Sequence, residues 1–198
     1  MLGLDNSGKT TLLYRMKHNQ VIDKTKPTTA FNVETIRLYN NNIKFMVWDT
    51  AGHDSVRPLW RAYVRKSDAM IFVIDSSDAT RFDEARVELD SILSSTESHG
   101  IPLLILANKQ DLEKSVPTIE LSRELDLDSL KDSVNWHLHP TSGRYGEGVQ
   151  DSLVQLADMI TKHRKLVSSS SSTRRKSMNN NTAVMTPGFQ KIEASKFI

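Results

Sequence analysis

Continuous apolar runs alternate along this chain with amphipathic segments. Residues 69–75 and 103–108 are each a continuous apolar run that ends in one polar residue, Asp75 or Asn108, which is typical of parallel strands buried on both faces. Residues 81–93, and those from 149 to about 165, instead repeat their apolar positions at the spacing of one helical face. Strands that alternate with helices in this way predict an α/β fold with a parallel sheet.

Shorter patterns add elements to this core. Residues 36–39 and 43–48 favour strands on either side of Asn40-Asn41-Asn42, which predicts a hairpin turn. Residues 136–138 predict a short final strand, and residues 11–16 predict a helix that follows a glycine-rich loop. The expected architecture is a doubly wound, mostly parallel sheet flanked by helices.

The C-terminal residues differ in composition from the rest. Residues 168–198 begin with five serines and hold too little apolar surface to offset the entropy of ordering, so we expect a folded domain over 1–167 and a disordered tail after it. Residues 162–198 carry eight Lys or Arg against one Glu, whereas the remainder carries 18 basic against 23 acidic residues. The absence of cysteine excludes a disulfide scaffold, and no segment resembles a membrane span or a secretory signal.

Residues 3–10 carry the pattern G-x-x-x-x-G-K-[ST]. In such a loop the backbone N–H groups surround a phosphate chain, the lysine contacts the β- and γ-phosphates, and the last hydroxyl binds Mg²⁺. The dipole of the following helix also favours an anion. A chance match is the alternative, since Gly and Ser are ordinary turn residues. The pattern predicts nucleotide contacts from Gly3, Leu4, Asp5, Asn6, Ser7, Gly8, Lys9, Thr10 and Thr11.

Two further motifs come directly after expected strands. In Asp49-Thr50-Ala51-Gly52, the aspartate is placed to hold the Mg²⁺ shell and the glycine N–H to approach a γ-phosphate. In Asn108-Lys109-Gln110-Asp111, the last carboxylate can accept hydrogen bonds from the N1–H and 2-amino groups of guanine. Adenine offers neither donor and would leave that carboxylate unpaired. The motifs favour GTP over ATP, and a polar strand-to-helix loop is the alternative for the second. Nucleotide contacts are expected at Asp49, Thr50, Ala51, Gly52 and His53 and at Asn108, Lys109, Gln110 and Asp111.

In this order, the three motifs resemble those of small GTPases. The loop G-L-D-N-S-G-K-T and residues 31–35, 57–63 and 108–112 are similar to the Arf/Arl (ADP-ribosylation factor-like) family. Residues 136–141, W-H-L-H-P-T, together with the basic end of the last helix, are most similar to its Arl4-like subgroup. The resemblance covers roughly residues 1–166. It implies a P-loop NTPase fold and a switch between GDP and GTP forms with Mg²⁺.

The resemblance also implies roles for particular residues. Pro27-Thr28 resembles the first switch, whose Thr28 hydroxyl would join Thr10 and Asp49 at Mg²⁺ when a γ-phosphate is present. Ser142 and Gly143, within T-S-G, occupy the place of a third guanine-contacting element. Lys9 would stabilise charge during hydrolysis.

Residues 31–48 would form an interswitch hairpin in this family. Phe31, Trp48 and Tyr63 would then make an exposed aromatic patch that effectors bind, with plain core packing as the alternative. An exchange factor and a GTPase-activating protein are expected as further partners. The implied function is regulation of membrane traffic, the cytoskeleton or signalling by recruitment of effectors.

His53 follows Gly52, where Arf proteins carry the glutamine that orients the attacking water. A neutral imidazole can accept a hydrogen bond from water, so we expect a catalytic or water-positioning role and slow hydrolysis that a partner accelerates. The alternative is a scaffold that binds GTP with negligible hydrolysis. A P-loop ATPase or kinase is a more distant alternative, disfavoured by residues 108–111.

Only Met1 and Leu2 precede the phosphate loop, so the family's N-terminal helix and nearly all of its first strand are missing from the printed chain. The loss of a central strand is expected to expose apolar neighbours and to leave the loop poorly supported. A truncated gene model is the favoured explanation, and a natural variant of reduced stability is the alternative.

Two basic clusters lie near the C-terminus, at Lys162, Arg164 and Lys165 and at Arg174, Arg175 and Lys176. Such clusters bind anionic lipid, serve as nuclear-import signals or contact nucleic acid, and they are often only solvated surface. An anionic membrane or an importin is the expected contact, and no specific nucleic acid is expected. The chain is expected in the cytoplasm, with peripheral attachment to membranes and entry to the nucleus as alternatives. Phosphorylation of Ser177 would weaken attraction to an anionic surface.

Overall fold

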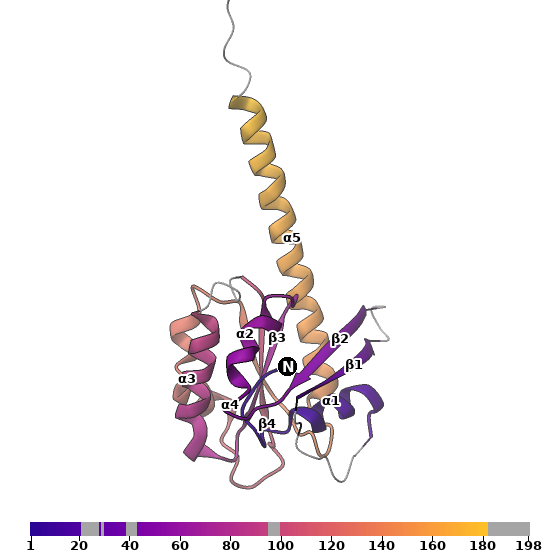
Figure 1. Cartoon of the computed structure of the whole chain (residues 1–198), viewed down its shortest axis with the longest axis vertical. Helices are drawn as coiled ribbons and strands as arrows, with labels where there is room; N and C mark the ends of the chain where they lie inside the picture. The colour runs from indigo at the N-terminus through magenta and orange to yellow at the C-terminus, as the bar shows by residue number, and fades with distance from the viewer. Residues whose placement is uncertain (21–27, 29, 39–42, 95–99, 182–198) are drawn as a thin grey trace, which may run out of the picture. The chain divides into compact units, whose positions relative to one another are not determined.

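The computed structural model describes residues 1–20, 28, 30–38, 43–94 and 100–181, with the side chains of 170–181 excepted. Contacts divide the chain into two units, Met1–His163 and Arg164–Ile198. The first unit holds the sheet and the flanking helices (Figure 1). The predicted turn at Asn40-Asn41-Asn42 and the predicted switch residue Pro27 lie outside the described residues.

Three parallel strands form the centre of the first unit. They are β3 (Met70–Asp75), β4 (Leu103–Asn108) and β5 (Trp136–Pro140), in the order β3-β4-β5. Strand β4 is buried along its whole length, because it is central in the sheet and both of its faces are covered. The prediction of a doubly wound sheet is confirmed.

Helices cover both faces of this sheet (Figure 1). On one face, Phe72 and Ile105 pack with α2 (Trp60–Val64), α3 (Phe82–Leu93) and α4 (Thr118–Glu124). On the other, Val73 and Leu106 pack with α1 (Lys9–His18) and α5 (Val149–Asn181). The alternation of side chains along each strand explains why neighbouring residues of one strand belong to different cores.

A two-stranded antiparallel hairpin packs against the second core. It consists of β1 (Phe31–Leu38) and β2 (Ile43–Thr50), with Ile36 opposite Phe45. Strand β1 begins five residues before the predicted start, because its first residues alternate between exposed and half-buried positions and lack an apolar run. Three short 3₁₀ turns complete the described elements: η1 (Arg57–Leu59), η2 (Ala79–Arg81) and η4 (Leu127–Leu130).

Met1 and Leu2 connect the hairpin with the parallel sheet. The Leu2 N–H donates to the Ile71 carbonyl (2.8 Å), and the Leu2 carbonyl accepts from the Val73 N–H (2.9 Å). On the other side, the Thr50 N–H donates to the Met1 carbonyl (3.2 Å). The Leu2 side chain is buried in the core. These two residues therefore bond to β3 on one side and to β2 on the other, and these bonds fix the position at which the phosphate loop begins.

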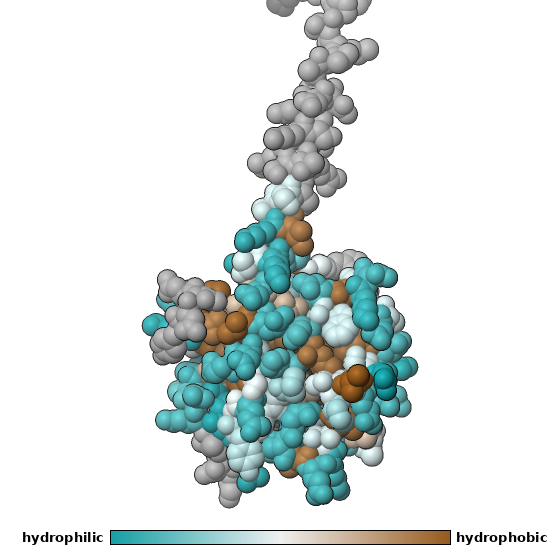
Figure 2. Space-filling view, turned by 180° about the vertical axis from the view of Figure 1, so that it is seen from behind, coloured by the Kyte–Doolittle hydropathy of each residue, from teal (hydrophilic) through white to brown (hydrophobic). Residues whose placement is uncertain are grey.

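Helix α5 runs to Asn181, beyond the predicted end near Lys165. Residues 168–181, expected to be disordered, are helical in the structure; no Pro or Gly between 149 and 181 ends the helix. Residues 182–198 lie outside the described residues, and the division at 167/168 stays a prediction. Within the described ranges, no helix combines the length and hydropathy needed to cross a bilayer. Figure 2 shows one face of the molecule as mostly hydrophilic, with small separate apolar areas.

Candidate nucleotide-binding site

A cavity of about 270 Å³ lies over the phosphate loop. Its lining comes from the loop and the start of α1, from the first switch, from the end of β2 and from the loop after β4. Every lining residue is one that the sequence predicts as a nucleotide contact: Asp5, Asn6, Gly8, Lys9, Thr10, Thr11, Thr28, Ala51, Gly52, His53 and Lys109. The structure therefore brings motifs from four separate segments together around one space.

Glycines give the phosphate loop its close contacts with the sheet. Gly3 and Gly8 both have positive φ, at 134° and 91°. A Cβ on Gly3 would lie 2.2 Å from the Val73 carbonyl oxygen, and one on Gly8 would lie 2.3 Å from the Asn108 side chain. The conformation and the space both require glycine at these positions. Leu4 is buried in the core, so it offers a ligand only its backbone.

Lys9 begins α1 and lies across the loop. Its buried Nζ donates to the carbonyls of Gly3 (2.8 Å) and Leu4 (2.6 Å). Burial lowers the pKa of Lys9 to about 8, although the nearby carboxylates of Asp49 and Asp5 oppose this shift. A phosphate beside this ammonium would supply the negative charge that its buried position lacks.

The three predicted Mg²⁺ ligands meet at one point. The Thr10 hydroxyl donates to Asp49 Oδ2 (2.6 Å) and lies 2.7 Å from the Thr28 hydroxyl. Asn32, from β1, also donates to Asp49 Oδ2 (3.2 Å). The other carboxylate oxygen, Asp49 Oδ1, is buried and has no hydrogen-bond partner among the described residues. Two hydroxyls around a carboxylate with an unpaired oxygen form the hard oxygen set that suits Mg²⁺.

The turn after β2 lies directly on the phosphate loop. A Cβ on Gly52 would come within 2.3 Å of the Asp5 nitrogen and 2.4 Å of the Leu4 carbonyl carbon. His53, next along the chain, is exposed and lines the cavity. Thr50 differs from its neighbours, because its hydroxyl donates to the Met1 carbonyl (3.2 Å) and its side chain is buried. The turn thus presents Gly52 and His53, rather than the side chain of Thr50, to the cavity.

Asn108 connects the phosphate loop with the predicted base-binding loop. Its Nδ2 donates to the Ser7 carbonyl (2.8 Å), and its Oδ1 accepts from the Gly143 N–H (3.0 Å). Asp111 Oδ1 accepts from the Ser142 hydroxyl (2.7 Å). The predicted guanine-contacting residues 108, 111, 142 and 143 are therefore held together in one hydrogen-bonded group.

The two middle residues of the N-K-x-D motif have different surroundings. Lys109 has a positive φ of 66° and pairs with Asp75 (2.6 Å), while it also lines the cavity. Gln110 donates from its amide to the Ser76 hydroxyl (2.9 Å) and the Val116 carbonyl (3.1 Å). Its side chain therefore braces the loop after β4 instead of facing the cavity.

Arg15 is a buried residue that the sequence reasoning missed. From α1 it donates to the carbonyls of Gly143 (3.2 Å) and Arg144, which holds the base-binding loop against the phosphate-binding helix. Its partners lie 128 and 129 residues away, so no local pattern identifies them. The one available signal is a charged residue between the buried Leu12 and Met16 of an otherwise apolar stripe.

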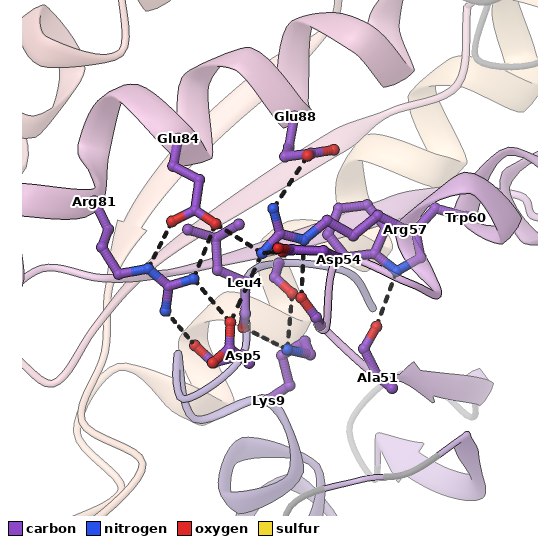
Figure 3. A network of polar contacts seen from close by, with 12 residues as sticks. Leu4, Asp5, Lys9, Ala51, Asp54, Arg57, Trp60, Arg81, Glu84 and Glu88 are labelled. Atoms are coloured by element: carbon purple, nitrogen blue, oxygen red, sulfur yellow. Dashed lines mark hydrogen bonds and ion pairs between the residues drawn. The ribbon is translucent and has the colours of Figure 1, made fainter.

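An ion-pair network beside the cavity was also missed by sequence reasoning (Figure 3). Glu84 of α3 bonds to both Arg81 (2.7 Å) and Arg57 (2.7 Å). The hydrogen bond from Arg81 lowers the pKa of Glu84 to about 2; burial opposes this shift, and Arg57 adds to it. Burial raises the pKa of Asp5, but bonds from Arg81 outweigh it and hold that pKa below its usual value. Both carboxylates are therefore ionised at neutral pH.

Phe31, Trp48 and Tyr63 form an aromatic patch on the hairpin and α2. Their ring centroids lie 5.2 to 6.2 Å apart in all three pairs. Phe31 is 46% exposed and Trp48 38% exposed, so these rings do not belong to the core. Exposed apolar rings that contact one another are typical of protein-binding surfaces.

The glycine-rich loop before α1, the parallel sheet and the four converging motifs define a P-loop nucleotide-binding protein with the small GTPase fold. The profile of the ADP-ribosylation factor family matches residues 1–160. The chain belongs to that family.

Curated relatives place it more finely. The chain is 44% identical over 170 residues to ADP-ribosylation factor-like protein 4A of Homo sapiens. The aligned residues cover 84% of each of the two chains. It is 44% identical over 168 residues to human ADP-ribosylation factor-like protein 4C, with 83% of this chain and 87% of that one covered. The resemblance to the Arl4-like subgroup is therefore confirmed.

A solved structure agrees with this assignment. The Arl6 BBS3 small GTPase from Trypanosoma brucei, with the bound nucleotide analogue GppNp, superposes with a TM-score of 0.74 at 31% identity. The match covers 82% of this chain and 96% of that one. The family is one of guanine nucleotide-binding switches, and the fold prediction is confirmed.

Proposed function

We propose that this protein is a Mg²⁺-dependent GTP switch that hydrolyses GTP slowly and recruits effectors when GTP is bound. The observation that carries this proposal is the link that Asn108 makes between the two ends of the candidate site. The phosphate end offers Lys9 and the oxygens around Asp49, and Lys9, Thr10 and Thr28 line the cavity. The base end, outside the residues that line the cavity, offers Asp111 and the Gly143 region to a base.

The proposed chemistry is phosphoryl transfer from GTP to water. Lys9 and the loop N–H groups stabilise charge on the phosphates, and the Gly52 N–H contacts the γ-phosphate. Mg²⁺ held by Thr10, Thr28 and Asp49 would neutralise charge on the β- and γ-phosphates. The exposed imidazole of His53 accepts a hydrogen bond from the attacking water and orients it. Because an unassisted imidazole supplies only this one contact, intrinsic turnover is slow and an activating protein accelerates it.

The aromatic patch is the proposed effector surface. It begins three residues after Thr28, and Trp48 directly precedes Asp49, so both strands of the hairpin connect the patch with the phosphate end. An exchange factor and an activating protein would bind the adjoining switch residues. The processes regulated would be membrane traffic, the cytoskeleton or signalling.

The basic residues of α5 support peripheral attachment to an anionic membrane. Lys162, Arg164 and Lys165 are exposed. Each basic residue near an anionic bilayer contributes about 1 kcal/mol. Binding to vesicles that contain PIP₂ should weaken when Lys162 and Lys165 are changed to Gln. If it does not, and if Arg174, Arg175 and Lys176 can also be neutralised without effect, the basic segment has another role, with nuclear import as the first to test.

Single-turnover hydrolysis of radiolabelled GTP tests the proposed reaction. The wild-type protein with Mg²⁺ should release phosphate slowly, and His53→Ala should slow it further, by about 10-fold. An unchanged rate in His53→Ala would remove the proposed role of that residue. No hydrolysis with tight GTP binding, even with an activating protein, would favour the binding-only scaffold. Equal affinity for ATP and GTP would revive the ATPase alternative.

A further inference from the structure

Arg57 is a buried cation that bonds to the turn at Gly52, the residue whose N–H is proposed to contact the γ-phosphate. Its side chain is 7% exposed, and its Nε donates to the Gly52 carbonyl at 2.9 Å. It comes from η1, five residues after Gly52, so one 3₁₀ turn returns its guanidinium to the turn it follows (Figure 3).

The other edge of the same guanidinium faces α3. Its Nη2 pairs with Glu84 Oε1 (2.7 Å), and its Nη1 pairs with Glu88 Oε1 (3.1 Å). Asp54, which is 88% exposed, adds a third contact at 2.6 Å. Two carboxylates on successive turns of one helix therefore fix the plane of the arginine, and that plane fixes the direction of Nε toward Gly52.

Arg81 connects the same carboxylate with the phosphate loop. It bonds to Glu84, to the Asp5 carbonyl (3.1 Å) and to the Asp5 carboxylate (2.8 Å). Glu84 thus lies between one arginine that holds the Gly52 turn and another that holds the loop (Figure 3). The Gly52 turn and the phosphate loop are therefore both linked to Glu84, at the start of α3.

Gly52 has little space in which to move independently of this network. Its Cα lies so close to the loop that an added Cβ would approach the Asp5 nitrogen to 2.3 Å. The neighbouring Ala51 carbonyl is held by the Trp60 indole N–H (3.0 Å), and Trp60 is itself buried. A shift of Arg57 is therefore transmitted to the Gly52 peptide rather than absorbed by free space.

We propose that Arg57 is a positioning residue, which sets the Gly52 N–H and His53 at the γ-phosphate and couples them to the Glu84–Glu88 face of α3. The inference rests on the proposed GTP switch. It predicts that changes at Glu88, which lines no part of the nucleotide cavity, alter the preference for GTP over GDP. It also marks this face of α3 as a place from which a bound protein could change that preference.

The test compares affinities for GDP and for a non-hydrolysable GTP analogue, together with single-turnover hydrolysis of GTP. Arg57→Gln should weaken binding of the GTP analogue about 10-fold more than binding of GDP, and should slow hydrolysis by at least that factor. Glu88→Gln should shift the same ratio in the same direction by about 3-fold, because it removes the negative charge of one of the two α3 carboxylates that fix Arg57. Glu88→Gln also keeps the test valid if Arg57→Gln fails to fold.

Arg61→Gln is the matched control. Arg61 also links α2 to α3, through the Ser91 carbonyl and hydroxyl, but it makes none of the contacts with Gly52. It should change both affinities by less than about 2-fold, as expected for an exposed contact. Equal effects on GDP and GTP in Arg57→Gln and Glu88→Gln, or none, would overturn the proposal. Failure of the wild-type protein to bind guanine nucleotides would instead reject the proposed function itself.

Discussion

The two ends of the candidate nucleotide site, the base end around Asn108 and the phosphate end around Lys9, differ in how far their polar groups are already paired. At the base end, Asn108 bonds to Ser7 and Gly143, Ser142 bonds to Asp111, and Arg15 holds the same loop by its carbonyls. At the phosphate end, Asp49 Oδ1 and the Ser7 hydroxyl are buried, and neither has a hydrogen-bond partner within the part of the chain that the structure describes. Lys9 is desolvated there and has carbonyls, not anions, as its direct partners.

This difference assigns separate tasks to the two ends. Under the proposed function, a preformed base end would recognise guanine without rearrangement, because its hydrogen bonds already fix the loop. The phosphate end keeps unpaired buried groups, whose desolvation cost falls only when phosphates and a cation arrive. The end that responds to the presence of a γ-phosphate is therefore the one that is incompletely satisfied without it.

The largest expected effect is at the phosphate end, in Lys9→Met. Loss of this buried ammonium should weaken GTP binding by about 4 kcal/mol, roughly a thousand-fold. The nucleotide-free protein should meanwhile unfold no more easily, because removal of the desolvated cation offsets the loss of its hydrogen bonds to the Gly3 and Leu4 carbonyls. Calorimetric binding and urea unfolding measure the two quantities. Lys17→Met, on the same helix, removes only a partly exposed ion pair with Glu34, so it should leave GTP binding unchanged and lower stability by less than about 1 kcal/mol. A larger loss of stability in Lys9→Met than in Lys17→Met would contradict this account.

A pair of asparagine variants compares the stability of the two ends. Asn108→Ala should lower the free energy of unfolding by about 2 to 3 kcal/mol, because it leaves the buried Ser7 carbonyl and Gly143 N–H unpaired. Asn32→Ala should lower the free energy of unfolding by less than about 1 kcal/mol, because the hydrogen bonds that Asn32 donates to Asp49 (3.2 Å) and Thr28 (3.4 Å) are long. Urea denaturation of both nucleotide-free variants gives these values. Equal losses of unfolding free energy would mean that the hydrogen bonds of the base end stabilise the fold no more than those of the phosphate end.

Asp111→Ala tests base recognition alone. The carboxylate is placed to accept from the guanine 2-amino group, which inosine lacks, so the wild-type protein should prefer GTP to ITP by about 10-fold or more. The variant should bind both nucleotides with similar affinity. Glu113→Ala, in the same loop and exposed, serves as the control and should keep the preference. A preference that persists in Asp111→Ala would assign base recognition to another residue.

The smallest effect is a pH dependence at Glu84. Its pKa falls from the ordinary 4.5 to about 2 in the folded protein, so its stabilising contribution is complete above pH 4.5 and is lost as the pH falls toward 2. Because the carboxylate is partly exposed, this contribution should stay below about 1 kcal/mol. Urea unfolding of wild type and Glu84→Gln should differ by a constant amount above about pH 5 and converge near pH 2. A difference that grows on acidification would contradict the assignment.

The sequence predicted those features whose signal is local. Strand β4 was predicted to the residue, because a strand buried on both faces is a continuous apolar run. The motifs that carry the predicted site residues could be recognised because each sits at the end of such a strand or at the start of a helix, and the roles of those residues stay predictions. Arg15 and Arg57 were missed because each holds a backbone carbonyl, of Gly143 and of Gly52, that only the folded chain brings close to the arginine. The helical residues 168–181 were missed because serine runs are compositionally typical of disorder.

Amide hydrogen exchange in the GDP-bound and GTP-analogue-bound protein tests the contrast between the two ends most directly. We predict that replacing GDP by the analogue raises protection of residues 49–53 by about 10-fold or more, since the Gly52 N–H gains a partner. Residues 108–111 and 141–143 should change by less than about 2-fold, because their hydrogen bonds are already formed. Equal changes at both ends, or a change confined to the base end, would contradict the account.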